Sequence, residues 1–213
     1  VINQANLVLD NSSNITDATL RATVEGEALF LRAMTYFDLV KFFGGVPLRT
    51  VGVTNYGADL DIARSSADDI YAQVVSDLTD AYAKLPVSNG EFADRYAAQA
   101  LLARVYLQQG NFASALAAAN DVLQNSGHSL ASTFSGAFNN DSDSSEDIFA
   151  FQVTSQDGSN VLISHYADQP YGGRGGDIVV DTYRTLFDSS LDSRLFFFYY
   201  SSFNGGLLTG KYT

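Results

Sequence analysis

Two short segments of the chain each place an aromatic ring close to a hydrogen-bond donor and an acceptor. The residues concerned are Asn55, Tyr56 and Asp59 in the first segment and Tyr171, Arg174 and Asp177 in the second. A sugar presents an apolar C–H face and a rim of hydroxyl groups, so an exposed ring with polar neighbours suits it. These residues are therefore the candidate ligand contacts. The alternative is that both segments are ordinary connecting loops.

The sequence contains few residues that could form a catalytic site. A nucleophile needs an adjacent base, and hydrolysis of glycosides needs paired carboxylates in a cleft. The two histidines, His128 and His165, both fall in segments expected to be surface loops. We expect no catalytic residues and no histidine metal site.

Two motifs imitate ion-binding loops but lack their essential residues. The acidic run "NNDSDSSED" has no turn glycine and has Gln152 where a calcium loop beginning at Asp141 needs glutamate. The segment "YGGRGGD" lacks the lysine and hydroxyl residue of a phosphate-binding loop. The sequence therefore predicts no metal and no cofactor.

Composition narrows the possible partners. Acidic residues outnumber basic ones by 24 to 12, which gives a formal net charge of −12. Such a chain repels phosphate backbones, so we expect no nucleic-acid partner. There is no cysteine, which excludes disulfides, thiolate metal sites and a cysteine nucleophile.

No stretch of the sequence has the roughly 18 apolar residues that a membrane span needs. Charged residues interrupt the best candidate, which lies between Glu25 and Lys41. The chain begins at Val1 without a targeting segment and ends without a closing element. We therefore expect it to be a fragment of a longer protein.

A long helix is predicted from about Ala22 to Phe43. Its apolar residues recur every three or four positions, namely Leu29, Ala33, Tyr36, Val40 and Phe43. Gly44 and Gly45 supply a permissive helix end, and Pro47 prevents continuation. Residues 44–66 lack helical periodicity and are expected to form a long loop.

Three more helices are predicted after this loop. The second opens with a capping box of Ser66 and Asp69, buries the stripe of Ile70, Val74, Leu78, Ala81 and Leu85, and stops at Pro86. The third runs from about Asp94 to Gln109, with a core face of Ala97, Leu101, Arg104 and Leu107. The fourth is "FASALAAANDVLQN". Because only Gly110 and Asn111 precede it, it must turn back antiparallel to the third.

The segment "LLARVYLQQGNFASAL" has the small and aromatic residues of a tetratricopeptide helix pair. The predicted fold class is therefore mainly α, with tetratricopeptide-like antiparallel helix pairs, long loops and a few short strands. We expect one domain over residues 1–213, with a helical repeat core at about 22–125 and a loop-rich part at about 126–213. In the latter, "DIFAFQV" predicts a strand, 180–187 a short helix, and "RLFFFYYSSF" a buried strand or core segment.

One long motif resembles a known family. The segment "EGEALFLRAMTYFDLVKFFGGVPL" is similar to the signature of the SusD-like (RagB/SusD) nutrient-binding lipoproteins. Further similar segments follow in order, among them "RSSADDIYAQVVSDLTDAYAKLP", "SSEDIFAFQV" and "LDSRLFFFYY". The resemblance covers nearly the whole chain but only the N-terminal part of the family's length.

The resemblance implies a surface protein of Bacteroidetes-type bacteria, held on the outer membrane by an N-terminal lipid that lies outside this chain. Such a protein binds a glycan or other nutrient and delivers it to a SusC-like TonB-dependent transporter. It implies a binding subunit and no enzyme. Two alternatives remain open at this stage: a tetratricopeptide adaptor for other proteins, and a glycoside hydrolase on a helical scaffold.

Overall fold

The structure, a computed structural model, describes residues 1–55, 61–138, 144–151, 161–174, 181–187 and 191–209. The chain divides into two compact units, residues 1–129 and 130–213, and each is described here by itself. The single-domain organisation expected from the sequence stays a prediction.

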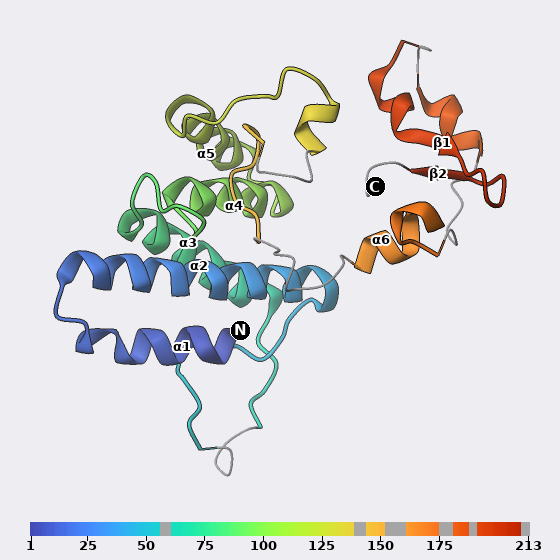
Figure 1. Cartoon of the computed structure of the whole chain (residues 1–213). Helices are drawn as coiled ribbons and strands as arrows, with labels where there is room; N and C mark the ends of the chain where they lie inside the picture. The colour runs from blue at the N-terminus through green and yellow to red at the C-terminus, as the bar shows by residue number, and fades with distance from the viewer. Residues whose placement is uncertain (56–60, 139–143, 152–160, 175–180, 188–190, 210–213) are drawn as a thin grey trace. The chain divides into compact units, whose positions relative to one another are not determined.

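The first unit consists of helices packed in chain order (Figure 1). They are α1 (Ile2–Asn11), the 3-10 helix η1 (Ser12–Asn14), α2 (Ala18–Phe43), α3 (Ala67–Lys84), α4 (Arg95–Gln108) and α5 (Phe112–Asn125). Each of α2 to α4 packs on the helix that follows it, and α1 lies beside α2. The predicted mainly α fold is confirmed, and the four predicted helices correspond to α2 to α5, although α2 begins at Ala18, four residues before the predicted start. The helix α1 was not predicted.

Local chemistry sets the ends of these helices. The side chain of Asp17 accepts hydrogen bonds from the main-chain N–H groups of Thr19 and Leu20 and so begins α2. The capping box of Ser66 and Asp69 at the start of α3 is present as predicted. At the other end of α2, Gly44 has a φ of 68°, which side chains disfavour, so a glycine ends the helix.

The predicted core stripe of α3 is confirmed, because all five of its residues are buried. The predicted face of α4 is wrong for Arg104 and Leu107, which are exposed. Helix α4 packs between α3 and α5, so it buries residues on two sides: Tyr96, Ala97, Ala98, Leu101, Leu102 and Val105. A single stripe cannot describe a helix covered in this way.

The end of α2 departs from the predicted stripe. Leu29, Ala33, Tyr36 and Val40 are buried, but Phe43 is 61% exposed and its neighbour Phe42 is 80% exposed. The apolar stripe therefore runs one turn further than the packing that covers it.

The second unit has short elements. They are η2 (Ser135–Phe138), α6 (Val161–Tyr166), η3 (Gln169–Tyr171), η4 (Asp181–Leu186), η5 (Ser193–Phe197), β1 (Phe198–Tyr200) and β2 (Leu207–Thr209). The strands pair antiparallel, with Tyr199 opposite Leu208. Burial concentrates on β2, where Leu207 and Leu208 are enclosed. The aromatic run, predicted as a buried strand or core segment, contains the strand β1, but the residues of β1 are half-buried or exposed.

Two further predictions for this unit need correction. Residues 147–151, the described part of "DIFAFQV", form no strand, because no described segment pairs with them. Alternation over so few residues does not supply the partner that a strand requires. The helix expected at 180–187 is the 3-10 helix η4, and α6 was not predicted.

Membrane-spanning character is not found in the described helices. Even α2, with 26 residues, lacks the sustained apolar sequence of a transmembrane segment.

Candidate functional site

The loop between α2 and α3 carries the first predicted group of ligand residues, and its two ends are joined. The main-chain N–H of Ser65 donates to the carbonyl oxygen of Val46 at 3.0 Å. A Cβ atom on Gly45 would lie 2.1 Å from the carbonyl oxygen of Ser65, so only glycine permits this approach. The loop therefore leaves and re-enters the helical scaffold at one point.

Side chains of α1 bind the main chain of the outgoing arm of this loop. Asn3 accepts from the N–H of Val53 at 2.7 Å and donates to its carbonyl oxygen at 3.1 Å. Asp10 accepts from the N–H of Gly52 at 2.7 Å. The arm thus has partners for its polar main-chain groups although it belongs to no sheet.

Asn6 of α1 makes the central contact of this arm. Its Nδ2 donates to the carbonyl oxygens of Arg49 and Val51, at 3.1 and 3.2 Å. Its Oδ1 accepts from Nη1 of Arg32 at 2.9 Å. All the polar atoms of a side chain only 1% exposed are therefore used.

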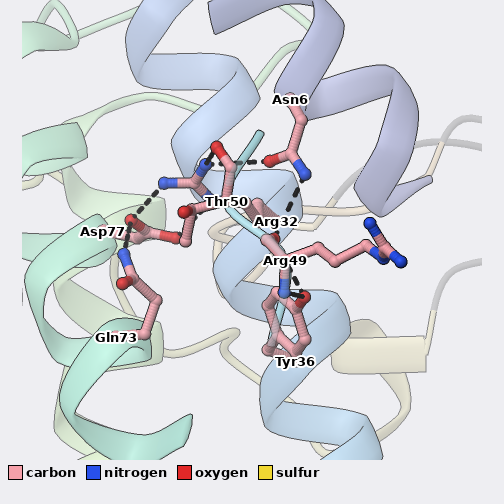
Figure 2. Close-up of polar contacts among 7 residues, drawn as sticks. All are labelled: Asn6, Arg32, Tyr36, Arg49, Thr50, Gln73 and Asp77. Carbon is pink, nitrogen blue, oxygen red and sulfur yellow. Dashed lines mark hydrogen bonds and ion pairs between the residues drawn. The ribbon is translucent and has the colours of Figure 1, made fainter. Parts of the chain in front are cut away.

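Arg32 of α2 connects α1, the loop and α3, as Figure 2 shows. Its Nε and Nη2 each lie 2.7 Å from a carboxylate oxygen of Asp77 on α3. Its Nη1 also donates to the carbonyl oxygen of Thr50 at 3.3 Å. Arg32 is therefore the structural partner of a buried carboxylate.

Tyr36 of α2 also binds the arm, at the main chain of Arg49 (Figure 2). Its hydroxyl accepts from the N–H of Arg49 at 2.7 Å and donates to the carbonyl oxygen of that residue at 3.0 Å. Burial raises the pKa of the Tyr36 hydroxyl above its ordinary value of 10.0. The hydroxyl stays protonated and can serve both contacts.

Chemically, this arrangement positions a loop. Its side chains are engaged with main-chain groups or with one another, so its geometry is fixed. Of the predicted residues that follow, Asn55 is exposed, while Tyr56 and Asp59 lie outside the described residues.

The second predicted group follows a turn in the other unit. The carboxylate of Asp168, which is buried, accepts from Ser201 Oγ at 2.7 Å and from the N–H of Gln169 at 2.8 Å. Gly172 has a φ of 83°, and a Cβ on Gly173 would lie 1.8 Å from the carbonyl oxygen of Ala167. The first two glycines of "YGGRGGD", Gly172 and Gly173, thus permit a tight turn.

This turn places Arg174 beside α6, since its N–H donates to the carbonyl oxygen of Ser164 at 3.0 Å. The Arg174 side chain is exposed. Tyr171 ends η3, and Asp177 lies outside the described residues. The two predicted groups belong to different units, and each stays a prediction.

The histidines lie in different settings. His128 is half-buried in a loop, as expected, whereas His165 lies on α6 and not in a loop, with its side chain exposed. Within the described ranges, no three histidine or acidic side chains gather closely enough to hold a metal ion.

The polar residues of α1 were missed by the sequence predictions. Asn3, Asn6 and Asp10 have the i, i+3, i+7 spacing that places side chains on one helix face. That spacing is the signal that could have found them, together with the apolar Ile2, Ala5 and Leu9 at the same intervals.

A family profile matches residues 1–107, half of the chain. Its description is starch-binding associating with outer membrane, and its name is SusD-like. The match spans α1 to almost all of α4, including the joined loop.

Individual proteins point the same way. SusD-like protein P2 of Formosa agariphila is 31% identical over 130 residues, which are 59% of this chain and 25% of that protein. A laminarin-binding SusD-like protein of known structure is 26% identical with a TM-score of 0.61, over 64% of this chain and 32% of that one.

A SusD-like carbohydrate-binding protein from Bacteroides vulgatus matches 100% of this chain and 50% of its own, with 21% identity and a TM-score of 0.80, which supports the fold alone. The chain spans about a quarter of the length of the curated relatives it matches.

Proposed function

This chain belongs to the SusD-like family, and from that membership we propose that it is part of a cell-surface protein that binds carbohydrate. The observation that carries the proposal is the match over residues 1–107, which contains the motif of α2 and the joined loop. One relative of known structure is named as a laminarin-binding SusD-like protein, and this supports a glycan ligand.

The proposed protein captures an oligosaccharide and passes it to a SusC-like TonB-dependent transporter. A lipid on the N-terminal side of this chain would hold it to the outer membrane, in keeping with the outer-membrane association of the matching family. The packed helices α2 to α5 supply a rigid surface on which a transporter could dock.

Binding without catalysis fits the described chemistry. The buried Arg32 and Asp77 are paired with each other, and Tyr36 is committed to the main chain of Arg49. Groups with such fixed partners position a loop. We therefore propose a binding subunit and no enzyme.

The proposed ligand contacts are the loop residues Asn55, Tyr56, Asp59, Tyr171, Arg174 and Asp177. The exposed side chains of Asn55 and Arg174 support this assignment. A guanidinium offers planar donors to sugar hydroxyls, and a tyrosine ring offers a stacking face.

Calorimetry on the full-length protein tests the proposal, with maltohexaose and laminarihexaose as starch-derived and laminarin-derived probes. Tyr56→Ala and Tyr171→Ala each remove a ring, and losing a stacking contact should weaken binding by about 1 kcal/mol or more. Tyr56→Phe and Tyr171→Phe keep the ring and should bind nearly as the wild type.

Three results would count against the proposal. If the wild type binds neither sugar, carbohydrate binding of these classes is wrong. If both alanine variants bind within a few tenths of a kcal/mol of the wild type, neither loop is a stacking platform. Steady turnover of either sugar by the purified protein would contradict a purely binding role.

A further inference from the structure

Helix α1 holds the loop between α2 and α3 by the loop's main chain. Three polar side chains of one helix face, which we call the α1 clamp, bind the main chain of residues 49–53. They are Asn3, Asn6 and Asp10. Their spacing of three and four residues brings all of them to the same side of the helix.

The clamp binds main-chain atoms. Carbonyl oxygens of Arg49, Val51 and Val53 accept from asparagine side chains, and the N–H groups of Gly52 and Val53 donate to side-chain oxygens. The arm is thus held through both its N–H and its carbonyl groups. The contact therefore fixes the path of the backbone, whichever side chains the arm carries.

Close packing adds a steric limit to these bonds. A Cβ atom on Gly52 would lie 2.5 Å from Cδ2 of Leu7 and 3.0 Å from Oδ2 of Asp10. The arm and α1 are thus as near to each other as glycine allows.

The clamp is also anchored to the helical core. Asn6 binds Arg32, and Arg32 binds Asp77 of α3 through two hydrogen bonds. Gln73 donates a further hydrogen bond to Asp77 at 2.7 Å. A rigid scaffold therefore stands behind the helix face that holds the arm.

We infer that α1 is a positioning helix, whose clamp holds residues 49–53 in one conformation and thereby positions the predicted ligand residue Asn55, which follows directly on this arm. The inference rests on the proposed function for the identity of the ligand. Asn55 lies only two residues beyond the last clamped residue, Val53, so little chain is available to absorb a change in the arm.

The test combines Asn3→Ala and Asp10→Ala in the full-length protein. Both side chains lie outside the Arg32 network, so the core pairing is kept. Hydrogen exchange followed by mass spectrometry should show the amides of residues 50–55 exchanging roughly tenfold faster or more, because Gly52 and Val53 lose their acceptors. Exchange in α3 should stay as in the wild type.

Two variants act as controls. Asn11→Ala removes a side-chain hydrogen bond to Leu7 on the same helix without touching the loop, and should leave exchange in residues 50–55 unchanged. Asp10→Asn keeps an oxygen acceptor for the N–H of Gly52, so the Gly52 amide should exchange at close to the wild-type rate in this variant. A helix that merely adds stability would respond to Asn11→Ala as well.

Binding is measured on the same proteins with maltohexaose and laminarihexaose. If only about a tenth of the molecules keep the clamped conformation, the apparent Kd should rise about tenfold. Unchanged exchange in residues 50–55 overturns the inference, and so does faster exchange with wild-type affinity. If the wild type binds neither sugar, the proposed function fails for these ligands, and the exchange data still decide whether α1 fixes the loop.

Discussion

Asp77 of α3 accepts two hydrogen bonds from Arg32 of α2, and both N–O distances are 2.7 Å. The two side chains are only 7% and 2% exposed. Burying two charges costs much of what their attraction returns, so such a pair adds little net stability. Removing one partner is a different matter, because the other charge then stays buried alone.

Asp77→Ala should therefore destabilise the protein by about 3–5 kcal/mol. Urea denaturation followed by circular dichroism measures the change. The matched control is Asp38→Ala, which removes an exposed pair with Lys41 and should cost no more than about 0.5 kcal/mol. A loss below about 1 kcal/mol for Asp77→Ala would show that the Arg32 charge finds other compensation.

The double variant Arg32→Met with Asp77→Leu should be less destabilised than Asp77→Ala. It removes both charges together and leaves neither one buried without a partner. The same denaturation experiment compares the two. If the double variant is the less stable, the other contacts of Arg32, with Asn6 and Thr50, outweigh the ion pair.

Tyr36→Phe should cost about 1–3 kcal/mol. The change removes the hydroxyl that serves the N–H and the carbonyl oxygen of Arg49, and leaves partly buried main-chain groups without that partner. Tyr71→Phe is the control, since the Tyr71 contact with Phe37 is made by the ring. Equal losses for the two variants would contradict a special role of the Tyr36 hydroxyl.

Gly26 of α2 and Leu85 should show strong coupling. A Cβ atom on Gly26 would lie 2.7 Å from Cγ of Leu85, so Gly26→Ala forces this side chain to move. Overpacking of this kind destabilises a protein by about 1–3 kcal/mol. Alanine favours the helix over glycine and offsets up to about 1 kcal/mol of this loss. Leu85→Ala alone should cost about 2–5 kcal/mol.

The double variant Gly26→Ala with Leu85→Ala measures the coupling between the two positions. Leu85→Ala makes room for the new methyl group, so the two changes together should cost at least about 0.5 kcal/mol less than the sum of the single changes. Additive losses in a thermal or urea series would mean that the backbone of α2 moves away and removes the contact.

Glu25 should make stability depend on acidity. The hydrogen bond from Lys84, followed by that from Ser12, lowers the pKa of Glu25 below its ordinary value of 4.5. A carboxyl with a lowered folded-state pKa contributes stability above the unfolded-state pKa, and this is lost as pH falls through the folded-state value.

The difference in unfolding free energy between wild type and Glu25→Gln should therefore be largest near pH 7 and shrink toward pH 3. Because the Lys84 side chain is 37% exposed, the difference should not exceed about 1 kcal/mol. Denaturation at both pH values measures it. A difference that grows on acidification would reverse the assigned direction of the shift.

Much of the helical core could be predicted because its determinants are local. The Ser66 side chain caps α3 by accepting from the N–H of Asp69, only three residues away. Gly44 ends α2 because it adopts a positive φ. The buried stripe of α3 follows from spacing within one helix. Such contacts form between residues that are near in sequence, so the sequence displays them.

The faces and partners could be predicted only in part. Leu107 has the spacing of a core residue but is exposed, since α4 is covered on two sides by α3 and α5. Which face of a helix is buried depends on its neighbours, and periodicity does not say how many neighbours there are.

The sequence by itself determined the four main helices, most of their ends, and the family motif of α2. Only the tertiary structure decided that Asn3, Asp10 and Arg32 would meet the loop and α3. Asn3 and Val53 are 50 residues apart, Asp10 and Gly52 are 42 apart, and Arg32 and Asp77 are 45 apart. A polar side chain can form hydrogen bonds with many different groups. The packing of the helices decides which of those groups lies within reach.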